Sequence, residues 1–182
     1  MRRRTNSTSK PEMEKFRALL AIFQKYAAQY DFDHLMLAAQ GYQESRLNQD
    51  VKSPGGAVGI MQVLPKDAAA SPINIANVSN AEGNIHAAAK MLRNIADTYF
   101  NDPKVDSFNR ALFVLASYNA GPNRVARLRE QAKEQGLDPN VWFDNVELIA
   151  AKDIGQVTVT YVSNIYKYYV AYKLALEQTK LP

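Results

Sequence analysis

The chain contains no cysteine, and only two of its 182 residues are histidines. The absence of cysteine excludes disulfide bonds and thiolate metal sites. His34 and His86 lie in different segments, so a structural zinc site or a metal-dependent mechanism is a poor expectation. We therefore expect neither a metal nor any other cofactor.

Long hydrophobic runs are also missing. No apolar stretch approaches the roughly 18 residues that span a bilayer, so we expect no transmembrane segment. Residues 1–4 (MRRR) resemble the charged start of a signal peptide, but residues 5–9 (TNSTS) are polar where an apolar segment would follow. We expect no export signal in this chain and a disordered polar and basic tail over residues 1–10.

The excess of positive charge is small, with 22 Lys and Arg against 18 Asp and Glu, a net charge of +4. A mildly basic surface suits an anionic polymer, and charge alone does not identify that polymer. The sequence has no concentrated basic face with interleaved base-reading residues. We therefore expect no nucleic-acid partner.

The remaining composition is that of a folded domain, because 47% of the residues are apolar. A chain of this size buries roughly 70% of its unfolded surface in one core. Apolar residues recur at helical spacing along most of the chain. They predict a mainly α domain over residues 11–182, of about six to eight helices, the clearest over residues 11–30, from 32 or 34 to just past 44, 81–99, 107–118, 123–135 and from 156 onward.

Glu44 lies at the end of the predicted second helix, which Asp31 or Asp33 can cap. A carboxyl group donates a proton near neutral pH only if its pKa is raised, and removal from water is the main cause of such a shift. The negative end of the helix dipole acts in the same direction. Taken alone, Glu44 is better explained as a solvated glutamate at a helix end.

A glycine-rich segment follows at residues 53–62 (SPGGAVGIMQ). Its three glycines allow the main chain to approach a ligand or to adopt positive φ. Gln62 offers both a donor and an acceptor. The alternative is a tight turn that only positions the next helix.

Three segments together resemble the lytic transglycosylase domain of the soluble lytic transglycosylase type, whose fold is lysozyme-like: residues 44–45 (ES), 53–65 (SPGGAVGIMQVLP) and 116–122 (ASYNAGP). Residues 41–47 (GYQESRL) and 161–169 (YVSNIYKYY) resemble most the membrane-bound lytic murein transglycosylase F branch. In that branch the catalytic domain follows an N-terminal solute-binding-like domain. The resemblance extends over about residues 16–176 and implies an excised or separately encoded catalytic domain, with a regulatory N-terminal domain outside it.

The resemblance implies cleavage of the β-1,4 bond between N-acetylmuramic acid and N-acetylglucosamine in peptidoglycan strands, in the periplasm or cell envelope. No water is added, and the product ends in a 1,6-anhydromuramic ring. Glu44 would protonate the glycosidic oxygen and then accept the proton of the C6 hydroxyl. Most glycosidases need two carboxylates, whereas this reaction needs only one, and nothing marks Asp50 as a partner.

Further positions carry over one by one. Ser53 and Gln62 match residues that bind substrate, and Met61 and Leu64 match apolar walls of the cleft.

Two more groups come from the second half of the chain. Tyr118 and Asn119 match the Tyr-Asn pair that faces the catalytic glutamate, and Tyr161 matches a tyrosine of the last helix near the same site. Packing alone also explains both tyrosines. Many relatives carry a glutamate four residues before the last tyrosine, where this chain has Val157.

Two other functions compete with this interpretation. A hydrolytic muramidase similar to goose-type lysozyme would deliver water to C1 and would need a second acid such as Asp50. A non-catalytic glycan-binding module would keep the cleft without turnover, and the intact Glu44 argues against it.

Overall fold

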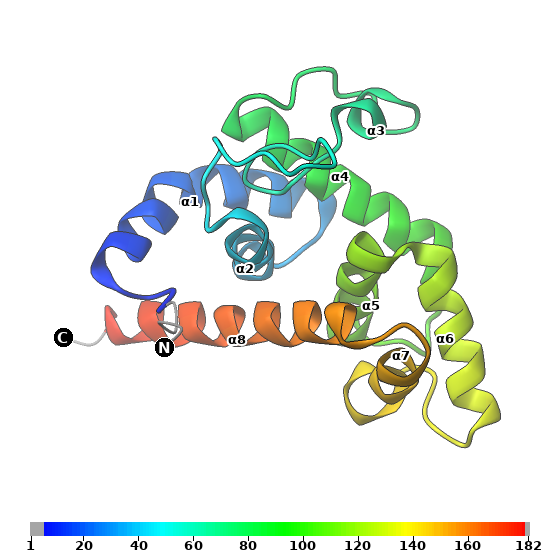
Figure 1. Cartoon of the computed structure of the whole chain (residues 1–182). Helices are drawn as coiled ribbons and strands as arrows, with labels where there is room; N and C mark the ends of the chain where they lie inside the picture. The colour runs from blue at the N-terminus through cyan, green and yellow to red at the C-terminus, as the bar shows by residue number, and fades with distance from the viewer. Residues whose placement is uncertain (1–5, 181–182) are drawn as a thin grey trace. The chain divides into compact units, whose positions relative to one another are not determined.

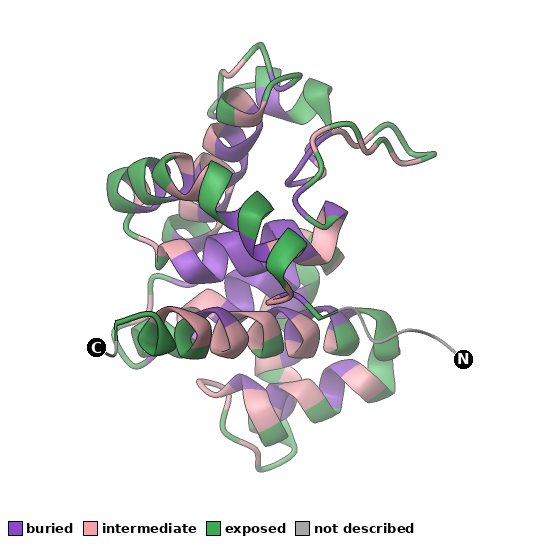
Figure 2. Cartoon of the chain, turned by 90° about the vertical axis from the view of Figure 1, so that its left-hand side faces the viewer, coloured by how far each residue is buried: buried purple, intermediate pink, exposed green. Residues whose placement is uncertain are grey.

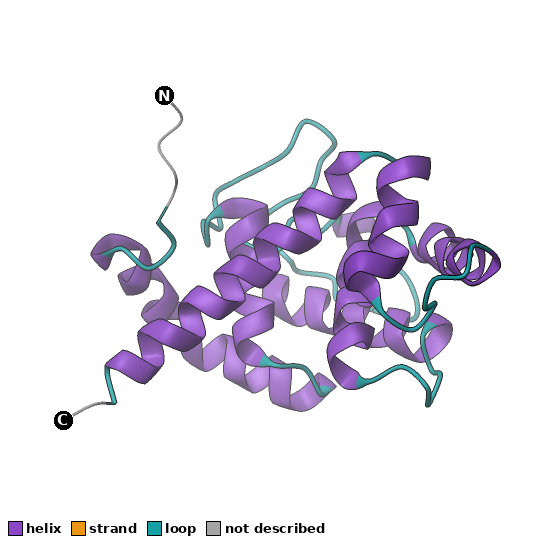
Figure 3. Cartoon of the chain, turned by 90° about the horizontal axis from the view of Figure 1, so that it is seen from below, coloured by secondary structure: helices purple, strands orange, loops and turns teal. Residues whose placement is uncertain are grey.

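Helices account for most of the computed structural model, which describes residues 6–180 (Figures 1 and 3). In this range the chain contains no β-strand, only isolated bridges. The helices in chain order are α1 (Lys10–Tyr30), α2 (His34–Ser45), α3 (Pro65–Ala69), α4 (Ala81–Tyr99), α5 (Ser107–Ala120), α6 (Pro122–Glu134), α7 (Glu147–Asp153) and α8 (Gln156–Gln178). The mainly α class expected from the sequence is confirmed.

The described residues divide into two compact units. The first lies within Met1–Lys90 and Ile165–Pro182, and the second within Met91–Asn164. The division falls inside α4 and α8, so each of these helices contributes to both units.

Aromatic contacts anchor α2 in the first unit, where it packs against α1. Phe16 of α1 is fully buried and stacks on Tyr172 of α8, with ring centroids 4.6 Å apart. Tyr42 of α2 meets Tyr168 of α8 edge-on at 4.7 Å. Burial raises the pKa of the Tyr42 hydroxyl to about 12. Tyr42 therefore packs as a neutral ring against α8, and most residues of α2 are buried (Figure 2).

A polar cluster joins α1 to α4 in the same unit. The Tyr26 hydroxyl and Lys25 Nζ both donate to Glu82 Oε1, each at 2.8 Å. His86 stacks on the Tyr26 ring at 4.4 Å and shares a hydrogen bond of 2.7 Å with the Tyr30 hydroxyl. Burial, followed by the charges of Lys90 and Lys25, lowers the pKa of His86 below its usual value.

This shift predicts that the protein loses stability in acid. The unfolded chain takes up a proton at His86 near its ordinary pKa of roughly 6.5, whereas the folded chain does so only at lower pH. Stability linked to His86 is therefore present above about pH 6.5 and is lost as the pH falls toward the folded pKa. Thermal unfolding between pH 7.5 and 5 should show a falling Tm, and His86→Gln should flatten that dependence. An equally steep dependence in the variant would contradict the assignment.

The second unit is built around Trp142, which is fully buried. Its ring meets Phe113 of α5 edge-on at 6.2 Å, and its backbone N–H donates to Asn109 Oδ1 at 2.9 Å. Arg129 of α6 lies 5.1 Å above the Phe113 ring and donates from Nε to the Pro139 carbonyl at 2.8 Å. The irregular stretch before α7 is therefore held by tertiary contacts.

The predicted helices agree with the observed ones to within a few residues. Asp33 caps α2 by accepting from the Leu35 N–H at 2.8 Å, and Asn80 accepts from the Gly83 N–H at the start of α4. The valines at the start of α8 are helical, as expected. Short α3 and α7, together with a turn over Trp142–Val146, were not predicted. Their stretches are too short or too irregular for a periodic apolar pattern.

Of the predicted disordered tail, residues 1–5 lie outside the described residues. Residues 6–9 form a turn that leads into α1, in which Asn6 Oδ1 accepts from the Thr8 N–H at 3.0 Å. Ser7 is buried.

Candidate functional site

Glu44 lies half-buried in the last turn of α2. The helix ends abruptly after it, because Arg46 and Leu47 both adopt left-handed backbone conformations with φ of 56° and 60°. The Arg46 N–H donates to the Tyr42 carbonyl at 2.9 Å and closes the final turn. This geometry places Glu44 at the carbonyl end of the helix, as the sequence predicted.

The loop after α2 folds into two linked tight turns. Val58 and Val63 exchange backbone hydrogen bonds of 2.9 and 3.0 Å, which makes residues 58–63 a small hairpin. Ahead of it, the Ser53 N–H donates to the Ala57 carbonyl at 2.9 Å, and Ser53 Oγ accepts from the Ala57 N–H at 3.0 Å. Gln62 adopts a positive φ of 49° in the hairpin. The loop is thus a defined structure with its own hydrogen bonds.

Three side chains bind the main chain at Ile60 and Met61. Ser45, the neighbour of Glu44, donates from Oγ to the Ile60 carbonyl at 2.8 Å. Gln49 Oε1 accepts from the Ile60 N–H at 3.1 Å. Asn84 Oδ1 accepts from the Met61 N–H at 2.8 Å. The loop is therefore tied to the end of α2 and to α4 by specific polar contacts.

Asn84 is the centre of this arrangement, and no motif in the sequence indicated a role for it. Its side chain is fully buried, and Nδ2 donates to the carbonyls of Val58 at 2.8 Å and Val78 at 3.0 Å. Gly59 lies so close that an added Cβ would come within 2.4 Å of Asn84 Nδ2, and its φ is +80°. The feature of the sequence that could have pointed to Asn84 is its place next to Ile85, where a polar residue adjoins the apolar face of a predicted helix.

The predicted loop residues differ in what they expose. Ser53 and Gln62 are half-buried, whereas Leu64 is 42% exposed and so open to a ligand. Gln62 Nε2 donates to the carbonyls of Val51 at 3.1 Å and Gly59 at 2.9 Å, so this amide nitrogen supports the loop itself.

Met61 has no exposed surface. A Cβ at Gly41 of α2 would come within 3.1 Å of its sulfur, so Met61 packs the loop onto the helix three residues before Glu44. Its role as a cleft wall in contact with substrate stays a prediction.

The other predicted residues belong to the second unit. Tyr118 is half-buried near the end of α5, and Asn119 is exposed. Asn119 Oδ1 accepts a hydrogen bond of 2.8 Å from Thr158 Oγ1, which brings the end of α5 to the first turn of α8. Tyr161 is buried and lies three residues after Thr158, on the same face of α8. Val157 is 76% exposed.

Titratable groups near the loop are few. Asp50, the second acid of the hydrolytic alternative, is exposed, and its backbone N–H donates to Asn48 Oδ1 at 2.9 Å.

Within the described residues, no group of three or more His, Asp or Glu side chains could hold a metal ion. Residues 6–180 also include no helix both long and apolar enough to cross a membrane.

Comparison with known proteins identifies similar sequences and folds. The family described as "Transglycosylase SLT domain" matches residues 21–140. A protein of Shewanella woodyi named membrane-bound lytic murein transglycosylase F is 35% identical over 161 residues, which cover 81% of this chain. A protein of the same name from Marinobacter nauticus is 33% identical over 162 residues, which cover 82% of this chain. In both cases the chain spans only 32% of the relative.

A solved structure has a similar fold. It is that of an inactive mutant of the lytic transglycosylase Slt from Pseudomonas aeruginosa, with a TM-score of 0.63 and 24% sequence identity. The match covers 86% of this chain and 24% of the other.

Proposed function

The chain belongs to the transglycosylase SLT domain family, and from this membership we propose that it is the catalytic domain of a peptidoglycan lytic transglycosylase. The observation that carries the proposal is the extent of the family match. Residues 21–140 contain Glu44, the whole glycine-rich loop and the Tyr118–Asn119 pair. The relatives' names, which describe murein transglycosylases, support the same substrate.

In the proposed reaction, one carboxyl group acts twice. Glu44 gives its proton to the glycosidic oxygen as the bond from that oxygen to C1 of N-acetylmuramic acid breaks. The C6 hydroxyl oxygen of the same sugar then bonds to C1, and its proton passes to the Glu44 carboxylate. The products are a free 4-hydroxyl on N-acetylglucosamine and a 1,6-anhydromuramic end, and Glu44 returns to its protonated state without any water being consumed.

The geometry of the first unit supports this role for Glu44. Glu44 is a half-buried residue at the carbonyl end of α2, where the helix dipole disfavours an ionised carboxyl group. Ser45 ties the glycine-rich loop to the same turn of the helix. A general acid works best on a rigid scaffold, because proton transfer requires hydrogen-bond reach to the leaving oxygen.

Substrate binding is assigned to the residues that the resemblance indicated. We propose that Ser53, Gln62, Leu64, Tyr118, Asn119 and Tyr161 bind the glycan, and that Met61, which has no exposed surface, supports the loop from behind as part of the cleft wall. We further propose that the reaction takes place in the periplasm or cell envelope, where peptidoglycan is found, and that an N-terminal regulatory domain acts with this one.

Product analysis tests the proposal directly. Purified peptidoglycan is digested in water enriched in ¹⁸O, and the new sugar ends are identified by mass spectrometry. We expect anhydromuramic ends without ¹⁸O. Reducing muramic ends carrying one ¹⁸O would make the protein a hydrolase, and bound but uncleaved glycan would make it a binding module.

Replacement of Val157 tests a departure from the pattern that the resemblance implies. We expect Val157→Glu to preserve or raise turnover, since many relatives carry a glutamate at this position. The side chain is exposed in the first turn of α8, where a negative charge is stabilising by roughly 0.3–1 kcal/mol. Turnover of peptidoglycan and thermal unfolding are measured together, with Val157→Gln as the uncharged control. A large loss of turnover in a well-folded Val157→Glu protein would refute the expectation.

A further inference from the structure

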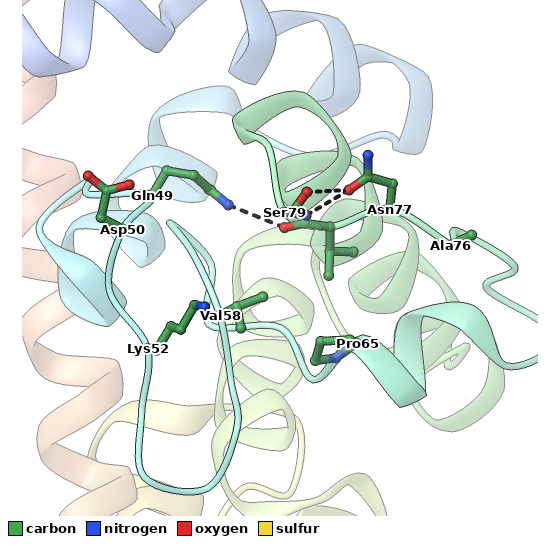
Figure 4. A pocket seen from close by; sticks show the side chains of 9 residues that line it. Gln49, Asp50, Lys52, Val58, Pro65, Ala76, Asn77 and Ser79 are labelled. Carbon is green, nitrogen blue, oxygen red and sulfur yellow. Dashed lines mark hydrogen bonds between the residues drawn. The ribbon is translucent and has the colours of Figure 1, made fainter.

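A pocket opens in the first unit on the glycine-rich loop, between residues 49–58 and the segment that precedes α4 (Figure 4). Its volume is ≈ 560 Å³, within the range of roughly 300–1,000 Å³ typical of small-molecule sites. Its lining includes one basic and one acidic residue, three apolar residues and two amides: Lys52, Asp50, Val58, Pro65, Val78, Gln49 and Asn77.

The walls of this pocket are held in place by internal hydrogen bonds. Gln49 Nε2 donates to the Val78 carbonyl at 3.2 Å, while its Oε1 accepts from the Ile60 N–H. Asn77 Oδ1 accepts from the Ser79 hydroxyl at 2.6 Å. Because these groups already have partners in the wall, the pocket is formed in advance of any ligand.

Lys52 supplies the positive charge of the pocket. It is exposed, forms no ion pair with the acidic side chains of residues 6–180, and is bridged to Val58 through the backbone. Figure 4 shows the Lys52 side chain extending toward Val58, whereas the carboxylate of Asp50 points away from Lys52. Val58, Val78 and Pro65 give the surface beside the ammonium group an apolar character. An ammonium group beside small apolar side chains suits a carboxylate that carries a methyl-sized group.

We propose that this pocket binds the carboxylate end of the short peptides that branch from the muramic acid of peptidoglycan. Those peptides end in small apolar residues with a free carboxylate, which matches Lys52 and its apolar neighbours. The proposal rests on the proposed function, and it adds a site for the peptide to the sites for the glycan. Lys52 directly precedes Ser53, which we assign to glycan binding, so their Cα atoms lie about 3.8 Å apart. A pentapeptide spans at most about 17 Å, so the carboxylate end of a peptide on a glycan bound at Ser53 is within reach of this pocket.

The first test compares two substrates. Glycan strands that carry pentapeptides with a free carboxylate are compared with strands from which an amidase has removed the peptides. We expect wild type to show a KM about three- to tenfold lower for the peptide-bearing strands than for the bare strands, because a partly exposed contact between charged groups strengthens binding by about that factor. Lys52→Met should abolish this difference and leave turnover of bare strands unchanged. Lys152→Met, at an exposed lysine of α7, is the matched control and should retain the difference. A preference that is absent in wild type or retained in Lys52→Met would overturn the proposal.

A second measurement is independent of catalysis. The isolated pentapeptide ending in D-alanine and its C-terminal amide are titrated into the protein, and the methyl NMR signals of Val58 and Val78 are followed. We expect these signals to shift with the free acid and to shift much less with the amide or in Lys52→Met. Equal shifts with both peptides, or none, would overturn the pocket assignment. If wild type cleaves neither substrate, the proposed function fails, and the titration still decides whether the pocket binds the peptide.

Discussion

Glu44→Gln should reduce the formation of anhydromuramic ends by about 10³-fold, within the range of roughly 10²–10⁴ for loss of a general acid–base group. Glutamine has nearly the shape of glutamate, but it neither gives a proton to the glycosidic oxygen nor accepts one from the C6 hydroxyl. Both halves of the proposed reaction therefore fail together. The measurement is the rate of appearance of anhydro products from purified peptidoglycan, quantified by mass spectrometry.

The structure offers a matched control for this variant. Asp50 lies six residues after Glu44 and is exposed, and Asp50→Asn removes the carboxylate named above as a second acid for the hydrolytic alternative. We expect Asp50→Asn to retain turnover of bare glycan strands within about twofold, since surface substitutions away from the chemistry have small effects. Thermal unfolding should show that Glu44→Gln is folded. If Asp50→Asn were as inactive as Glu44→Gln, the single-carboxylate mechanism would be wrong.

Asn84→Ala should lower the free energy of unfolding by roughly 2 kcal/mol. The substitution leaves the Met61 N–H without its buried partner, and an unsatisfied buried group costs about 1–3 kcal/mol. The carbonyls of Val58 and Val78 keep their hydrogen bonds from the Val63 N–H and from Gln49, so they add little. Chemical denaturation followed by circular dichroism measures the change.

Asn94→Ala is the control, because Asn94 is the same residue type on the same helix and is exposed. We expect a change of less than about 0.5 kcal/mol. If Asn84 also positions the loop for catalysis, Asn84→Ala should lose turnover at temperatures where it remains folded, whereas Asn94→Ala should not. Equal stability of the two variants would show that the loop does not depend on this side chain.

Local signals in the sequence were sufficient for the long helices and their ends. The α2 helix illustrates this, because Asp33 caps its start and the apolar pattern stops at Glu44, where the observed helix ends one residue later. Capping and periodicity act over three or four residues, so they can be read from neighbouring positions. The stretch before α7 has no such pattern, and contacts such as Trp142 N–H to Asn109, 33 residues away, hold it.

The sequence by itself determined the helical class, the position of Glu44 at a helix end and the presence of a glycine-rich loop after it. Only the tertiary structure decided how that loop is held. Ser45, Gln49 and Asn84 reach the main chain of Ile60 and Met61 across 15, 11 and 23 residues. Neither helical periodicity nor turn chemistry encodes such pairings, because they depend on which buried polar groups meet when the chain has folded. For the same reason the pocket beside Lys52 could not be predicted, since its walls come from both sides of α3.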